Sequence, residues 1–208
     1  MISQRQVRKY GRPLAHLACA LPLVVLLLRI EGIGGLNLGE NPSTEIRVFL
    51  GLWGLRLLLL TLAMSPLRWI TGKPWPLQFR RLLGLWSFTY IFIHFVTYFS
   101  LAESRKLSFL ADVEARPFIV IGLAAFVLMI PLALTSTSIS QQKLGIRWMK
   151  LHRMVYAIAV LGCGHYLWQA ASDTFESLAY CAIAVLLLGS RFWKSKQRQR
   201  LVEAGTTD

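Results

Sequence analysis

Six long apolar runs limit this chain to folds that a membrane can hold. Each run has about 17 to 20 residues, the length that a helix needs to cross the hydrocarbon core of a bilayer. Lipid offers the backbone no hydrogen-bond partners, so each run is expected to be an α-helix, which satisfies its own N–H and C=O groups. The runs cover residues 14–30, 46–64, 82–101, 118–134, 151–170 and 175–192.

The predicted fold class is an all-α membrane protein, built as a bundle of six transmembrane helices. The bundle takes up residues 14–192, between an N-terminal tail at residues 1–13 and a basic C-terminal tail at residues 193–208. The composition agrees, because 55% of the residues are hydrophobic and 16% are charged, against about 45–50% and about 25% in soluble domains.

The lysines and arginines indicate how the bundle is oriented. They concentrate in the two tails and in the loops after the second and fourth runs, whereas the loop after the third run holds Arg105, Lys106 and Arg116. Positive charge marks the cytoplasmic side of membrane proteins, so both termini are predicted to be cytoplasmic. This bias and contact with membrane lipid explain the net charge of +13, and no nucleic-acid partner is expected.

Two histidines are predicted to lie at the same depth in the membrane. His94 follows Arg81 by 13 residues, and His165 follows His152 by 13 residues. Arg81 and His152 mark the cytoplasmic starts of two parallel helices, and 13 residues of helix are about 20 Å long. Ionisable side chains inside a membrane are unfavourable and usually functional. Two histidines so placed can hold one haem iron from opposite sides.

Other interpretations of this pair are weaker. A single intramembrane histidine can serve only to form a hydrogen bond within the bundle, and that alternative stays open for each of them. Zinc is disfavoured, because no further Cys, Asp or Glu lies at that depth. Gly162 and Gly164 flank His165 and are expected to let a flat macrocycle approach the helix backbone.

Three further polar side chains in the runs have open roles. His152 is predicted to ligate a second haem or to contact a flavin or quinone, with an ordinary interfacial histidine as the alternative. His16 is expected to be structural. Arg56 lies in the middle of a run, where a haem propionate would be a suitable partner. The alternative for Arg56 is a side chain that reaches the interface or a backbone carbonyl. The sequence shows no internal repeat.

Several segments together resemble one family, the haem-binding MsrQ subunits of bacterial periplasmic methionine sulfoxide reductase systems. That family is part of a ferric-reductase-like transmembrane group, which also contains the NADPH oxidases. The resemblance covers about residues 10–193, and its most specific part is the stretch from Thr135 to Trp168. The segments that carry it are residues 39–46, 80–86, 116–118, 134–138, 143–153 and 165–168.

The resemblance implies a role in electron transport and protein repair at the bacterial inner membrane. It implies b-type haem and FMN as cofactors, and the family's haem histidines match His94, His152 and His165. Electrons would come from the quinone pool or a cytosolic flavin reductase. They would pass to MsrP, a periplasmic molybdopterin enzyme that reduces methionine sulfoxide. Catalysis would then belong to the partner, and this chain would carry no catalytic residue.

One departure from the wider group concerns the cytoplasmic side. Arg81 stands where the NADPH oxidases carry a second histidine, so a lower haem would lack that ligand. Either His152 works alone, or one histidine is shared, or Arg81 and His152 serve another cofactor. A basic cluster at this end could hold an FMN phosphate, although positive-inside bias alone would also produce it. The cluster consists of Arg80, Arg81, Lys143, Arg147, Lys150 and Arg153.

Two other functions stay open on the sequence. A stand-alone ferric or cupric reductase would reduce metal directly at the outer face, without a partner enzyme. A non-redox transporter or assembly factor would bind no haem, and the paired histidines disfavour it.

Overall fold

The computed structural model describes residues 6–100, 109–169 and 174–204, and in these residues every regular element is a helix. The prediction of an all-helical chain is thereby confirmed for the part that the structure describes. The elements are η1 (Val7–Gly11), α2 (Arg12–Ile30), η2 (Ile33–Gly35), α3 (Pro42–Thr71), η3 (Trp75–Phe79), α4 (Arg80–Ser100), α5 (Phe109–Ala115), α6 (Phe118–Leu134), α7 (Ser138–Leu144), α8 (Ile146–His152), α9 (Val155–Gln169) and α10 (Thr174–Ala204).

Among the residues that the structure describes, four helical segments are long and apolar enough to cross a membrane by themselves. They are residues 9–30, 42–71, 75–100 and 174–197. The pair α6 and α7 makes a fifth candidate, with a bend of 93° between the two helices. The fifth apolar run, predicted at residues 151–170, is divided, because α8 ends at His152 and α9 begins at Val155. With 15 residues, α9 is about 22 Å long, which is shorter than a hydrocarbon core of about 30 Å.

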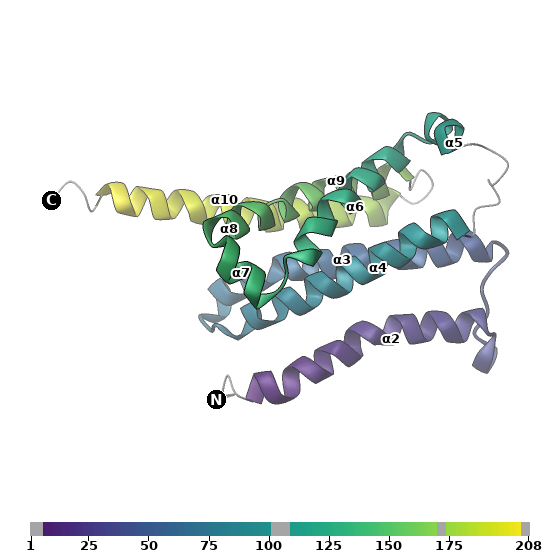
Figure 1. Ribbon diagram of the computed structural model, residues 1–208, viewed down its shortest axis with the longest axis horizontal. Helices are drawn as coiled ribbons and strands as arrows, with labels where there is room; N and C mark the ends of the chain where they lie inside the picture. Colours follow the sequence, from purple (N-terminus) through teal and green to yellow (C-terminus); the bar gives the residue numbers. More distant parts are fainter. Residues whose placement is uncertain (1–5, 101–108, 170–173, 205–208) are drawn as a thin grey trace.

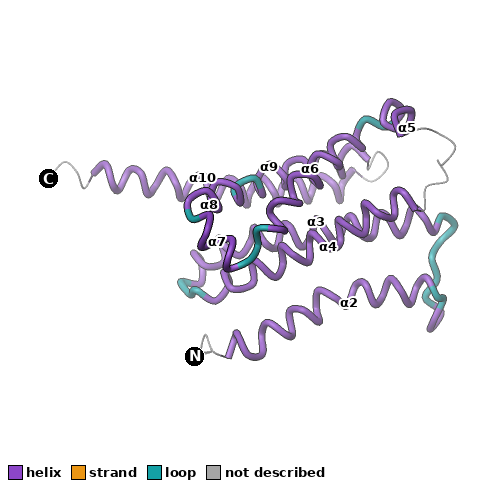
Figure 2. The backbone as a smooth tube through the Cα atoms, in the orientation of Figure 1, coloured by secondary structure: helices purple, strands orange, loops and turns teal. Residues whose placement is uncertain are grey.

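The long helices lie roughly along one axis (Figure 1). Helix α3 packs against α4, α6 packs against α9, and α10 covers both α9 and α3. Helix α2 runs along one edge of the bundle, and α7 and α8 fold across the end at which α6 stops (Figure 2). The first turns of α2 and the last turns of α10 lie at that same end, and α5 lies at the opposite end.

Two apolar clusters hold the bundle together. One joins α3, α6, α9 and α10 around Leu62, Ile158 and Ala159, which are at most 1% exposed. The other joins α2, α3 and α4 around Leu50 and Tyr90, which are fully buried. Because apolar burial inside lipid gains little, close packing and hydrogen bonds between helices supply the specificity.

Hydrogen bonds attach α2 to α4 at two levels. The buried Tyr90 hydroxyl donates to the carbonyl oxygen of Cys19 at 2.8 Å, and Trp86 Nε1 donates to His16 Nδ1 at 2.9 Å. His16 therefore has the structural contact that was expected of it.

Candidate functional site

A cavity of about 780 Å³ opens between α3, α4, α6 and α9. Its floor belongs to the buried core and consists of Leu58, Met129 and Ile158. Aromatic side chains such as Phe95 and Phe126 form its walls, and these two rings stack with 4.5 Å between their centroids. Polar side chains lie toward the end of the bundle opposite the chain termini, so the cavity is apolar inside and polar at its entrance. The polar side chains that line the cavity include Asn41, Ser43, Thr44, Arg47, Tyr98, Arg116, Gln169 and Glu176.

His94 of α4 and His165 of α9 meet across this cavity. Their ring centroids are 6.4 Å apart, and the ring planes are inclined by 79°. Two histidines that are 71 positions apart in the sequence thus meet at one point. The matched depth that the sequence predicts for these histidines is what makes the approach possible.

A backbone carbonyl fixes each of these rings. His94 Nδ1 is 2.9 Å from the carbonyl oxygen of Arg47 on α3, and His165 Nδ1 is 2.8 Å from the carbonyl oxygen of Phe118 on α6. A carbonyl oxygen only accepts, so each Nδ1 carries the proton and donates it. Each Nε2 is then left as a lone-pair donor, which is the usual arrangement of a metal-ligating histidine.

Two glycines make room for the rings. Gly51 lies one helical turn after Arg47, and Gly122 lies one turn after Phe118. A Cβ atom at Gly122 would lie 2.8 Å from the His165 ring, and one at Gly51 would lie 3.3 Å from the His94 ring. Any side chain at Gly122 would therefore push the imidazole away from its carbonyl.

The two histidines are presented in equivalent ways by two pairs of helices. In each pair, 47 residues separate the carbonyl from the histidine that it holds. Arg47 corresponds to Phe118 and His94 to His165, with a shift of 71 positions in each case. The same shift relates Arg81 to His152. The sequence interpretation found no internal repeat and missed this equivalence, which shows mainly in a Gly-Leu pair and a histidine at matching positions.

The two glycines that the sequence singled out have smaller roles. Gly162 lines the cavity, and a Cβ atom there would lie 3.6 Å from Leu55. Gly164 has open space around it, with nothing within 4 Å of a built Cβ atom.

Arg56 is paired with a carboxylate. Its Nε donates to the Tyr180 hydroxyl at 2.7 Å, and its Nη2 donates to Glu176 Oε1 at 3.3 Å. Tyr166, next to His165 in sequence, donates to the other oxygen of Glu176 at 3.1 Å. Glu176 lines the cavity, so Arg56 neutralises a negative charge at the cavity wall.

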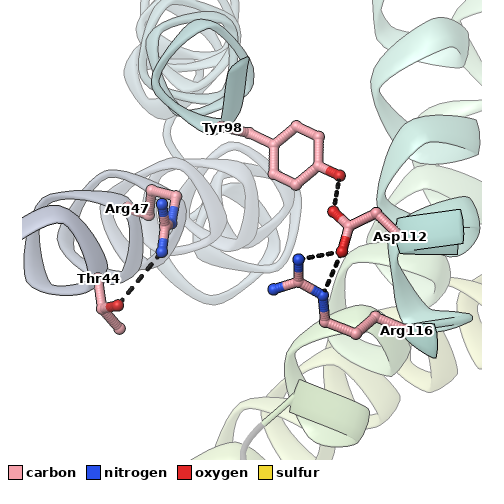
Figure 3. A network of polar contacts seen from close by, with 5 residues as sticks. All are labelled: Thr44, Arg47, Tyr98, Asp112 and Arg116. Carbon is pink, nitrogen blue, oxygen red and sulfur yellow. Dashed lines mark hydrogen bonds and ion pairs between the residues drawn. The ribbon is translucent and has the colours of Figure 1, made fainter. Parts of the chain in front are cut away.

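A second polar network lies at the end of the bundle opposite the chain termini (Figure 3). The Tyr98 hydroxyl and the Arg116 guanidinium both donate to the carboxylate of Asp112. Burial alone would raise the pKa of Asp112, but these hydrogen bonds and the charge of Arg116 outweigh it and lower that pKa. Arg47 donates to the hydroxyl of Thr44 at 3.2 Å.

His152 lies at the opposite end of the bundle, on α8. Its ring stacks on Trp148 with 3.9 Å between centroids, and its Nδ1 donates to the Trp148 carbonyl oxygen at 3.1 Å. His152 Nε2 is buried without a hydrogen-bond partner, as are Arg80 Nε and Gln78 Oε1. Buried polar atoms are rarely left unpaired. The side chains of Arg81, Arg147 and Arg153 are exposed.

Comparison with known proteins gives a consistent picture. Residues 50–163 match the family model of the ferric reductase like transmembrane component. That match covers more than half of the chain and includes His94 and His152. Together with the long apolar helices, it makes the chain a multi-pass membrane protein. No solved structure matches this chain.

Curated relatives are similar over most of their length. A protein of Ralstonia nicotianae is 44% identical over 185 residues, which are 86% of this chain and 84% of that protein. One of Azospira oryzae is 41% identical over 91% of this chain and 83% of its own length. One of Xanthomonas axonopodis pv. citri is 38% identical over 88% of this chain and 86% of its own length. Each is named protein-methionine-sulfoxide reductase heme-binding subunit MsrQ.

The Asp112 network predicts a pH dependence. The pKa of Asp112 is lowered by folding, so its contribution to stability is present above the unfolded value of about 3.9. That contribution is lost as the pH falls through the lower folded value. Thermal unfolding in detergent should show Asp112→Asn less stable than wild type at neutral pH. The difference should shrink below about pH 4. A difference that stays constant down to pH 3 would contradict this role of the charge.

Proposed function

The chain belongs to the family of MsrQ heme-binding subunits of protein-methionine-sulfoxide reductase, and from this we propose that it is a haem b electron-transfer subunit. The observation that carries the proposal is the pair His94 and His165. With metal–nitrogen bonds of about 2 Å and ring radii of about 1.1 Å, two imidazoles on one metal have centroids about 6 Å apart. The observed separation of 6.4 Å agrees with that value.

The cavity also suits the group. A volume of about 780 Å³ falls within the range of about 300–1,000 Å³ for small-molecule sites. Its floor and walls are apolar and aromatic, and its entrance carries polar and cationic side chains. Bound haem would supply one-electron transfer, while the chain fixes its ligands and sets its surroundings. Arg56 would hold the Glu176 carboxylate in place at the wall of the haem cavity and neutralise its charge.

The cytoplasmic end is proposed to hold a second cofactor. The unpartnered His152 Nε2 supports a ligand there. That ligand is either a second haem bound through His152 or FMN, whose phosphate would bind to exposed Arg81, Arg147 and Arg153. Arg80 Nε, also buried without a partner, would face the same ligand.

The route of the electrons follows from the proposed orientation. We place the chain in the bacterial inner membrane with six spans, residues 14–192, and with both tails in the cytoplasm. Electrons enter at the His152 end, from the quinone pool or a cytosolic flavin reductase. They leave at the His94–His165 end toward a periplasmic MsrP-type molybdopterin enzyme, which reduces methionine sulfoxide in oxidised proteins.

Histidine substitutions test this proposal. Reduced-minus-oxidised optical spectra of the detergent-purified protein should show a low-spin b-type haem in wild type. The signal of the outer haem should be lost in His94→Ala and in His165→Ala, because each change removes one axial ligand. His16→Ala, which alters a histidine bonded to Trp86 outside the cavity, is the matched control. The haem-to-protein ratio of His152→Ala separates one bound haem from two.

Two results would count against the proposal. Wild-type protein without haem, after expression with ample haem supply, would contradict it and favour a non-redox membrane protein. Rapid oxidation of the reduced protein by ferric chelates, with no response to MsrP and methionine sulfoxide, would favour a stand-alone metal reductase.

Glycine substitutions give a graded prediction. Gly122→Ala should lower haem affinity by about ten- to a hundredfold, the range seen when support of a metal ligand is lost. Gly51→Ala should have a smaller effect, because its Cβ atom would lie 3.3 Å rather than 2.8 Å from the facing ring. Gly164→Ala, with open space around it, should bind haem like wild type. Haem titration of the three variants measures this, and equal affinities would refute the ring-support role.

A further inference from the structure

Two arginines lie at the outer entrance of the cavity. Arg47 is in the first turns of α3, and Arg116 lies in the short link between α5 and α6. Both line the cavity, together with the two histidines deeper inside it. Figure 3 shows Arg47 beside Thr44, apart from the group that Tyr98, Asp112 and Arg116 form.

The same short segments hold the arginines and the histidines. The carbonyl of Arg47 itself fixes the ring of His94. The carbonyl of Phe118, two residues after Arg116, fixes the ring of His165. Each arginine is therefore tied in position to the histidine on its side of the cavity.

The entrance carries positive charge that is only partly balanced. Asp112 neutralises Arg116, with an Nε to Oδ1 distance of 2.7 Å. Arg47 has the hydroxyl of Thr44 as its side-chain partner among the described residues, and not a carboxylate. The positive charge of Arg47 also helps to lower the pKa of Asp112. Arg47 therefore contributes to the electrostatic potential around the Asp112 carboxylate. A ligand with negative charge at its outer edge would complete the balance.

We propose that Arg47 and Arg116 bind the two propionate carboxylates of the haem that His94 and His165 hold. The proposal rests on the function proposed above. Guanidinium groups bind carboxylates through paired, charge-assisted hydrogen bonds, and haem has two carboxylates on one edge. The arginines would direct that edge to the entrance and the apolar edge to the floor at Leu58, Met129 and Ile158.

Haem dimethyl ester provides a direct test, because its two propionates are esterified and carry no charge. Full-length protein is produced in haem-deficient cells and titrated in detergent with haem b or with the dimethyl ester. Arg47→Gln should lower the affinity for haem b by about tenfold, as expected for loss of a charge-assisted hydrogen bond. The affinity for the dimethyl ester should not change, and the low-spin spectrum should remain.

Further variants keep the test independent of folding. Arg116→Gln should behave like Arg47→Gln, and Arg47→Lys and Arg116→Lys should lose less affinity because the charge is kept. Arg29→Gln is the matched control, since Arg29 belongs to α2 and pairs with Glu45. It should bind both compounds as wild type does.

Two outcomes would overturn the proposal. Unchanged haem affinity in both glutamine variants would show that the arginines do not bind propionates. Equal losses for haem and its dimethyl ester would show that the arginines only support the fold. Failure of the wild type to give a low-spin spectrum with either compound would instead refute the function on which the proposal rests.

Discussion

The hydrogen bonds from two imidazoles to two helix carbonyls are the constraint on which the site depends. His94 Nδ1 donates to the Arg47 carbonyl and His165 Nδ1 to the Phe118 carbonyl, so both Nε2 atoms are left for a ligand between them. Each bond needs two helices in contact, α4 with α3 and α9 with α6, and a glycine at the point of contact. The core between α3 and α9 then sets the distance between the two rings.

The two ends of the bundle differ in how far their polar and charged groups are paired. At the outer end, Glu176 balances Arg56 and Asp112 balances Arg116, and the cavity between them is apolar inside. At the end that carries the termini, polar atoms of Gln78, Arg80 and His152 are buried without partners. Because unpaired buried groups are unfavourable, these atoms support the proposal of a second cofactor at the end that carries the termini.

The sequence was sufficient for the features that follow from chain length and spacing. Apolar runs of spanning length predicted the helices, and the equal distance of His94 and His165 from basic markers predicted their common depth. It was not sufficient where the outcome depends on which helix faces which. Gly122 supports a histidine 43 positions away, and Arg56 finds a carboxylate 120 residues away. Neither contact can be predicted from local sequence spacing. For the same reason the sequence singled out Gly164, which has nothing within 4 Å of a built Cβ atom.

His94 and His165 are proposed to bind one haem iron, and their ring planes are inclined by 79°. Electron paramagnetic resonance of the oxidised, purified protein tests this most directly. Axial imidazoles with perpendicular planes give a strongly anisotropic low-spin ferric signal, and this is the signal that we expect. A high-spin ferric signal, as given by haem with a single axial histidine, would contradict it.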